Sequence, residues 1–163
     1  MHAAVIGFSC RLPKAPDAQA FWRLLRNGAD AISETPRKRW DVDSLFASDP
    51  SPFEKMTIRW GGFLDQIDGF DAGFFSISPH EAAMMDPQQR LMLELCWEAL
   101  EDAGIVHGRL KDNRTGVFVG AISHDYASLL SHQGREAITP YTLTGFHRSI
   151  IANRGSPVSP DGL

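Results

Sequence analysis

The sequence predicts an α/β fold, with helices packed on the faces of a sheet whose strands are at least partly parallel. Residues 3–8 and 116–120 are short apolar runs rich in small and β-branched side chains, and we expect both to be buried strands. A long, strongly patterned helix is predicted between them over residues 85–104. Strands that alternate with helices in this way are typical of sheets whose faces are covered by helices.

The helix predicted over residues 85–104 has a start signal, a stop signal and a helical period. Asp86 is a suitable N-cap, Pro87 needs no N–H partner in the first turn, and Gln89 would complete a capping box with Asp86. Gly104 favours the left-handed conformation that ends a helix. Because apolar side chains cover most of the circumference, we expect deep packing. They are Leu91, Met92, Leu93, Leu95, Cys96, Trp97, Ala99, Leu100 and Ala103.

Shorter signals predict further helices. Asp17 is suited to cap a helix that ends near Gly28, and Ser78 to cap a helical turn over residues 79–84. We expect two more helices, over residues 124–130 and 144–153.

The segment between residues 32 and 75 has no clear period, because prolines and the pair Gly61-Gly62 interrupt it. It is nevertheless rich in aromatic side chains, so we expect irregular but packed structure and not a free linker. These side chains are Trp40, Phe46, Trp60, Phe63, Phe70, Phe74 and Phe75.

Composition limits the classes of function. The 163 residues suit one domain or less, and 43% hydrophobic with 22% charged residues is ordinary for a globular protein. A net charge of −4 gives no electrostatic footprint for nucleic acid. Two cysteines, and no charged-then-apolar leader before Val5, favour a cytoplasmic protein without a disulfide framework. Since no apolar run approaches the roughly 20 residues that span a bilayer, we expect no membrane association.

Short sequence motifs along the chain are more informative about its family than the periodicity of its apolar residues. They are Val5-Ile6-Gly7-Phe8-Ser9-Cys10-Arg11-Leu12-Pro13, Phe21-Trp22-Arg23-Leu24-Leu25, Arg39-Trp40-Asp41, Trp60-Gly61-Gly62-Phe63-Leu64, Phe70-Asp71-Ala72-Gly73-Phe74-Phe75-Ser76-Ile77-Ser78-Pro79, Asp86-Pro87-Gln88-Gln89-Arg90, Trp97-Glu98-Ala99-Leu100 and Thr115-Gly116-Val117-Phe118-Val119-Gly120. In this order they resemble the ketosynthase (β-ketoacyl synthase) domain of modular type I polyketide synthases. The resemblance runs to about Arg154, so we assign residues 1–154 to a truncated N-terminal portion of such a domain and residues 155–163 to an irregular tail.

The resemblance implies a partial, incomplete thiolase-like fold and an acyltransferase family. Ketosynthases join acyl units in polyketide and fatty-acid biosynthesis by decarboxylative Claisen condensation. An acyl chain passes from the phosphopantetheine arm of an acyl carrier protein to a cysteine, and a malonyl-type thioester then attacks it. The implied partners are an acyl carrier protein and a second ketosynthase subunit in a homodimer, and no bound cofactor is implied.

The catalytic motifs of the family do not occur in these 163 residues. The family's nucleophile lies in Thr-Ala-Cys-Ser-Ser, and its two histidines in His-Gly-Thr-Gly and Gly-His contexts. Cys10 follows the first predicted strand, and Cys96 lies on the apolar side of the long helix, where burial makes a thiol inert. The sequence also lacks metal-ligand spacings and nucleotide-binding glycine motifs. We therefore assign no catalytic, metal or cofactor-binding residue.

The resemblance implies a contribution to the wall of a pocket. Residues 120–123 and 138–142 are similar to parts of ketosynthases that border the acyl tunnel and the dimer seam. From these two stretches we expect Ile122, Tyr141 and Thr142 to line an acyl pocket or the seam.

Three functions remain open from the sequence. The first is the N-terminal fragment of a polyketide synthase ketosynthase, inactive as a lone chain because the nucleophile and both histidines are absent. The second is a non-catalytic binding module that docks on a full-length ketosynthase or on an acyl carrier protein. The third is an unrelated α/β domain, which accounts poorly for so many sequence motifs shared with ketosynthases.

Overall fold

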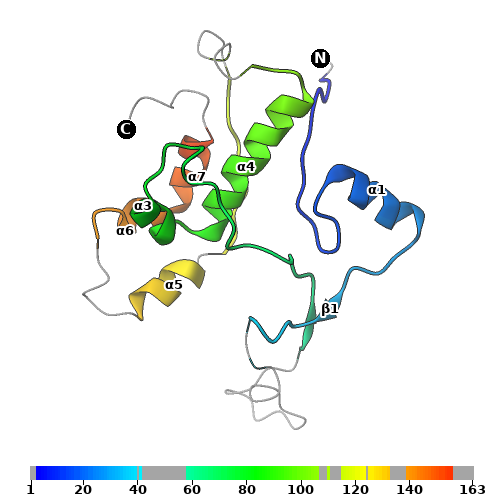
Figure 1. Cartoon of the computed structure of the whole chain (residues 1–163), viewed down its shortest axis with the longest axis horizontal. Helices are drawn as coiled ribbons and strands as arrows, with labels where there is room; N and C mark the ends of the chain where they lie inside the picture. The colour runs from blue at the N-terminus through cyan, green and yellow to red at the C-terminus, as the bar shows by residue number, and fades with distance from the viewer. Residues whose placement is uncertain are drawn as a thin grey trace. The chain divides into compact units, whose positions relative to one another are not determined.

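The computed structural model describes residues 3–39, 41, 58–106, 110, 115–123, 125–132 and 139–155 (Figure 1). They divide into two compact units. One unit is Cys10–Gln66, and the other joins Met1–Ser9 to Ile67–Leu163. The predicted tail 155–163 lies outside the described residues except for Gly155, so its boundary stays a prediction.

The unit Cys10–Gln66 contains helix α1, Ala18–Arg26, and a small sheet. As predicted, Asp17 caps α1 by accepting the N–H of Ala20 at 2.7 Å, and Gly28 follows the helix with φ +58°. Strand β1, Ser33–Glu34, pairs antiparallel with β2, Trp60–Gly61.

This sheet lies in the segment 32–75, for which the sequence predicts irregular structure. The pairing continues beyond the strands, because Thr35 donates its N–H and its hydroxyl to the carbonyl of Arg59, at 2.9 and 3.1 Å. Two-residue strands are too short to show a period of two in the sequence, which explains why the prediction missed them.

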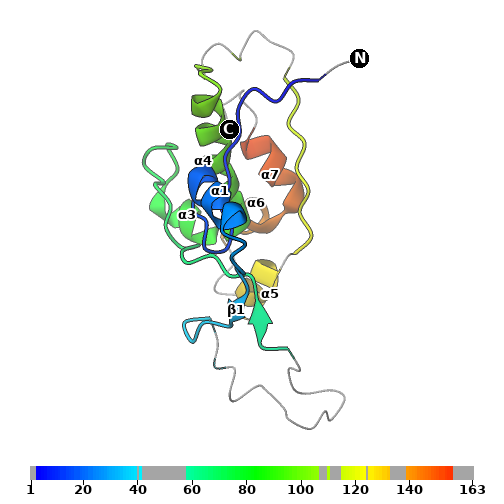
Figure 2. The ribbon, with the colours of Figure 1, turned by 90° about the vertical axis from the view of Figure 1, so that its right-hand side faces the viewer.

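The second unit contains five helices among its described residues. Helix α4 is the longest of them, α7 packs against α4, and α6 packs against α3 and α7 (Figure 2). Their bounds are α3 Pro79–Met84, α4 Pro87–Asp102, α5 Asp125–Ser131, α6 Thr142–Phe146 and α7 Arg148–Arg154. Within the described residues, none of the helices is both long enough and apolar enough to cross a bilayer.

The predicted starts of α3 and α4 are confirmed. Ser78 accepts the N–H of Glu81 at 3.2 Å, Asp86 accepts the N–H of Gln88 at 2.8 Å, and Pro87 begins α4. Beyond α4, Gly104 has φ +65°. Local start and stop signals therefore fix the ends of this helix.

Two further predictions for α4 are wrong. Gln89 does not form a capping box with Asp86, because the N–H of Asp86 donates to Gly145 at 2.7 Å and the Gln89 side chain points elsewhere. The helix is also not deeply packed. Gln89 is its one buried residue, and the apolar side chains are half-buried. The packing layers that this apolar surface requires are incomplete in the described part of the chain.

The single helix predicted over residues 144–153 is two short helices, α6 and α7. His147 separates them in an extended conformation, with ψ 123°. The carbonyl of Gly145, which a continuous helix would use to accept the N–H of Ser149, accepts the N–H of Asp86 instead. This tertiary bond ends α6 where the sequence gives no stop signal.

The strands predicted at residues 3–8 and 116–120 are not formed. Within the described part of the chain, neither segment makes a backbone–backbone hydrogen bond to a neighbouring strand. Both lie against α4 instead and leave large side chains exposed, including Val5 at 87% and Phe118 at 95%. A strand needs a partner for its N–H and C=O groups, and the described chain offers none to these two segments.

Few apolar side chains are fully buried. Met85 and Ala15 have no exposed surface, Ile151 is 4% exposed and Leu130 is 8% exposed. Met85 lies between α3 and α4, next to a close backbone approach: a Cβ built on Gly145 would lie 2.2 Å from the carbonyl oxygen of Met84. Only a glycine allows α6 to approach the α3–α4 turn so closely.

We predict that Gly145→Ala destabilises this unit, because an added Cβ must displace backbone atoms of Met84. The expected loss in free energy of unfolding is about 3 kcal/mol, measured from denaturant midpoints. Gly120→Ala is the matched control, since nothing lies within 4 Å of a Cβ at that position and its expected change is much smaller. Equal losses for the two variants would show that the α3–α4 turn is not packed as described.

Candidate functional site

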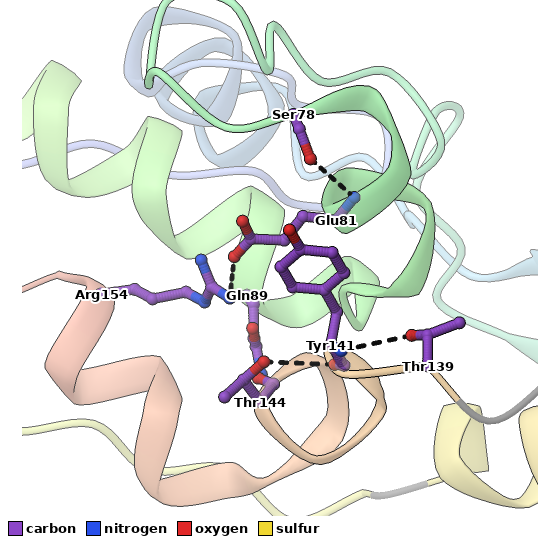
Figure 3. A network of polar contacts seen from close by, with 7 residues as sticks. All are labelled: Ser78, Glu81, Gln89, Thr139, Tyr141, Thr144 and Arg154. Atoms are coloured by element: carbon purple, nitrogen blue, oxygen red, sulfur yellow. Dashed lines mark hydrogen bonds and ion pairs between the residues drawn. The ribbon is translucent and has the colours of Figure 1, made fainter. Parts of the chain in front are cut away.

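One of the three predicted lining residues, Tyr141, lies where α3, α4, α6 and α7 meet (Figure 3). A second, Thr142, follows it as the first residue of α6. Polar side chains from all four helices and from the segments before α3 and α6 gather there. They are Ser78, Glu81, Gln89, Thr139, Tyr141, Thr144 and Arg154. We call these seven residues the polar junction.

One chain of hydrogen bonds in the polar junction joins α4 to α6. The Gln89 side-chain amide donates to the carbonyl of Thr144 at 3.0 Å, and the Thr144 hydroxyl donates to the carbonyl of Tyr141 at 3.2 Å. The Tyr141 N–H in turn donates to the hydroxyl of Thr139 at 3.2 Å. Gln89 is only 1% exposed, so its bond to Thr144 forms away from bulk water, where leaving a polar group unpaired is costly.

The turn before α6 holds Thr142 and Tyr141 in place. The Thr142 hydroxyl accepts the N–H of Thr139 at 2.7 Å, which closes the turn that starts the helix. The Tyr141 ring meets the His80 ring edge to face, with 5.7 Å between their centroids. The Thr142 hydroxyl is therefore occupied within the chain, while the Tyr141 side chain remains half-buried beside α3.

An ion pair joins α3 to α7 in the same junction. Arg154 donates to the carboxylate of Glu81 at 2.6 Å, and their side chains are 9% and 22% exposed. A pair so sheltered from water is screened little by salt. Glu81 therefore keeps the end of α7 against α3, which brings together residues 73 positions apart.

Two buried polar atoms of the junction have no partner among the described residues. They are the Gln89 side-chain oxygen and Nε of Arg154. Nε of Arg90, the residue after Gln89, is also buried without a hydrogen-bond partner among the described residues. Buried groups of this kind normally find a hydrogen-bond partner.

Ile122, the third predicted lining residue, lies in a different segment. Its side chain is 94% exposed, and its carbonyl accepts a hydrogen bond from Arg148 of α7 at 3.3 Å. The carbonyl of the next residue, Ser123, accepts from the side-chain amide of Gln88 at 3.2 Å. The segment is thus fixed to α4 and α7 by its backbone, and it presents an apolar side chain to solvent.

The two cysteines are free and half-buried. Burial raises the pKa of the Cys96 thiol above its ordinary value of 9.0, so the nucleophilic thiolate is disfavoured near neutral pH. Cys10 belongs to the other unit, Cys10–Gln66. Among the described residues, no three His, Cys, Asp or Glu side chains cluster as metal ligands would.

A family model decides what this chain is. Residues 2–157 match the model described as the N-terminal domain of β-ketoacyl synthases. The chain belongs to the β-ketoacyl synthase family. The third function considered from the sequence, an unrelated α/β domain, is therefore excluded.

Curated relatives of this β-ketoacyl synthase chain are polyketide synthases. The chain is 54% identical over 151 residues to polyketide synthase GfsA of Streptomyces halstedii, covering 93% of this chain and 2% of that protein. It is 46% identical over 143 residues to a phenolphthiocerol/phthiocerol polyketide synthase of Mycobacterium tuberculosis, covering 87% of this chain and 8% of that protein. The resemblance to polyketide synthase ketosynthases that the sequence motifs indicate is thereby confirmed.

Solved ketosynthase structures match the fold. An oxazolomycin ketosynthase domain of Streptomyces albus superposes with a TM-score of 0.82 at 38% identity, over 93% of this chain and 26% of that one. A ketosynthase from module 6 of the bacillaene synthase of Bacillus subtilis gives 0.78 at 35% identity, over 93% of this chain and 24% of that one. The predicted partial ketosynthase fold is confirmed, and the chain spans about a quarter of the length of these domains.

The sequence does not reveal how the polar junction assembles. Its local pattern predicts that Gln89 caps its own helix, whereas the Gln89 amide bonds to Thr144, 55 positions away. The sequence Thr139-Pro140-Tyr141-Thr142 does carry a turn signal, because hydroxyl side chains beside proline favour such turns. No local signal identifies the partners of Glu81 or Gln89, since both are distant in sequence.

We predict that Glu81→Ala destabilises the second unit by about 3 kcal/mol, because it leaves Arg154 unpaired in a sheltered position. Glu34→Ala is the matched control. It removes one partner of Arg59, from a pair in which Glu34 is 46% and Arg59 is 31% exposed, and its expected cost is about 0–1 kcal/mol. Denaturant midpoints that rank the two variants equally would contradict a structural role for the Glu81–Arg154 pair.

Proposed function

We propose that this chain supplies the N-terminal part of a polyketide synthase ketosynthase domain. The reaction of the completed domain is decarboxylative Claisen condensation between an acyl group and a malonyl-type thioester. The observation that carries the proposal is the match of residues 2–157 to the N-terminal domain of β-ketoacyl synthases, supported by a TM-score of 0.82 to a ketosynthase. The relatives are themselves polyketide synthases, which favours this function over a separate binding module.

In this proposal the chain contributes framework and pocket wall, and the reacting groups come from the rest of the domain. Cys96 is unsuited as a nucleophile, because burial raises its pKa and so keeps the thiol protonated. Residues 1–163 by themselves are therefore expected to form no acyl-thioester. The substrates of the completed domain are carried on the phosphopantetheine arm of an acyl carrier protein, and the domain pairs with a second ketosynthase.

Ile122, Tyr141 and Thr142 are proposed to line the acyl pocket or the dimer seam. The exposure of the Ile122 side chain, 94%, supports this role. Covering such an apolar side chain with an acyl chain or a partner removes it from water and is favourable. Tyr141 and Thr142 belong to a turn that is held by three hydrogen bonds with Thr139 and Thr144. A rigid wall fixes the shape of a pocket before the ligand enters.

A chimeric ketosynthase tests the proposal. Residues 2–157 of this chain replace the matched part of the oxazolomycin ketosynthase domain, which is 38% identical. After incubation with an acyl-N-acetylcysteamine thioester, mass spectrometry is expected to find one acyl group on the chimera, on a cysteine outside the transplanted segment.

The isolated chain of residues 1–163 is the control and is expected to remain unmodified. A second control is the Cys96→Ser chimera, which should be acylated like its parent. Stoichiometric acylation of Cys10 or Cys96 in the isolated chain, or a folded chimera that is never acylated, would contradict the proposed function.

A further inference from the structure

Helix α6 is too short to be stable by itself. It has five residues, Thr142–Phe146, whereas an isolated helix needs roughly 12–15 to be even marginally stable in water. Its place therefore depends on contacts outside the helix. A helix also leaves the carbonyls of its last turn without partners of its own. The groups that bind these carbonyls are the ones that hold α6.

Two consecutive carbonyls at the end of α6 accept hydrogen bonds from the start of α4. The carbonyl of Thr144 accepts from the side-chain amide of Gln89 at 3.0 Å. The carbonyl of Gly145 accepts from the N–H of Asp86 at 2.7 Å. The second donor is a backbone group, which any residue except proline supplies. Of these two bonds, the one from Gln89 is therefore the one that depends on the identity of a side chain in α4.

The same turn of helix carries Tyr141. The Tyr141 carbonyl accepts the hydroxyl of Thr144 at 3.2 Å and the N–H of Gly145 at 2.8 Å. The two residues that α4 holds by their carbonyls thus each donate a hydrogen bond to Tyr141. Because a single helical turn joins the three residues, a displacement of Thr144 is passed on to Tyr141.

The Tyr141 ring is held from a second side by α3. It points from α6 towards α3 and meets the His80 ring edge to face, with 5.7 Å between the centroids (Figure 3). The Tyr141 side chain is half-buried, so part of it remains for a ligand to contact. Gln89, in contrast, is only 1% exposed and cannot touch a ligand itself.

We propose that Gln89 is a positioning residue that sets the shape of the acyl pocket at Tyr141. The proposal rests on the proposed function, and it assigns Tyr141 to the pocket and not to the dimer seam. Gln89 acts through Thr144 and the turn of α6, so its loss allows the Tyr141 wall to move. A wall that moves distinguishes acyl chains less well, because a chain of the wrong shape then meets a smaller penalty.

The substrate preference of the chimeric ketosynthase tests this proposal. Second-order rate constants of acylation are measured for a series of straight-chain acyl-N-acetylcysteamine thioesters of increasing length. The readout is the ratio between the most and the least preferred thioester. Gln89→Met keeps the length of the side chain but cannot donate to Thr144, and we expect the ratio to fall at least about five-fold. Partial unfolding alone would lower all rate constants together and leave the ratio unchanged.

Two further variants separate positioning from stability. Thr144→Val keeps the branched shape of the side chain but removes the hydroxyl that donates to Tyr141, and we expect the ratio to fall at least about two-fold. Ile151→Val is the control. It shortens a side chain in α7 that is 4% exposed and leaves both bonds from α4 to α6 in place, so the ratio of the parent is expected.

Amide exchange tests the positioning step without acylation, on the chain of residues 1–163. The N–H of Gly145 donates to Tyr141, so its exchange rate reports how firmly the turn is held. We expect Gln89→Met to speed this exchange at least about ten-fold, and Ile151→Val to leave it unchanged.

Three outcomes would overturn the inference. The first is a folded Gln89→Met protein that keeps the parent's ratio or the parent's exchange rate at Gly145. The second is a parent chimera that accepts the whole series equally. The third is an altered monomer–dimer equilibrium of Gln89→Met with an unchanged ratio, because Tyr141 would then lie at the seam. A folded parent chimera that is never acylated would instead contradict the proposed function, and Gly145 exchange would then decide the positioning step.

Discussion

The close contact between Gly145 and the turn joining α3 to α4 is the constraint on which the rest of the second unit depends. The absence of a side chain lets the carbonyl of Gly145 reach the N–H of Asp86 at 2.7 Å. That bond satisfies a donor at the start of α4 and interrupts the helix that would otherwise continue into α7. It also sets α6 against α4, so that the amide of Gln89 reaches Thr144 at 3.0 Å. One backbone contact thus organises four helices.

The neighbours of α4 differ in how completely they are packed. On the side of the polar junction, buried hydrogen bonds and the pair between Glu81 and Arg154 fix helix positions without a large apolar core. Elsewhere, α4 is flanked by the segments 3–8 and 116–122, where Phe118 is 95% exposed. Large apolar side chains exposed in this way favour association. The structure therefore combines a hydrogen-bonded polar junction with segments whose apolar side chains are exposed.

Local features of this fold can be predicted from sequence, and tertiary ones cannot. The caps at Asp17 and Ser78 depend on a donor within three residues, so their chemistry is visible in the sequence. Gln89 and Gly145 have roles set by residues more than 50 positions away, and local rules give no access to them. The strand expected at residues 116–120 has the right side-chain alternation. It lacks strand partners in the described chain, because pairing is a property of neighbours and not of one segment. Of the candidate site, Tyr141 and Thr142 lie together in one turn, while their pocket role stays a prediction.

The central claim is the proposed function, in which this chain supplies the N-terminal part of a ketosynthase domain and does not close an apolar core by itself. Calorimetry combined with size-exclusion chromatography of the isolated chain tests it most directly. We expect self-association or a weak, broad unfolding transition, because the apolar surface of Phe118 and its neighbours remains in water. A monodisperse monomer with one sharp, cooperative unfolding transition would show that the chain closes its own core, and would contradict this claim.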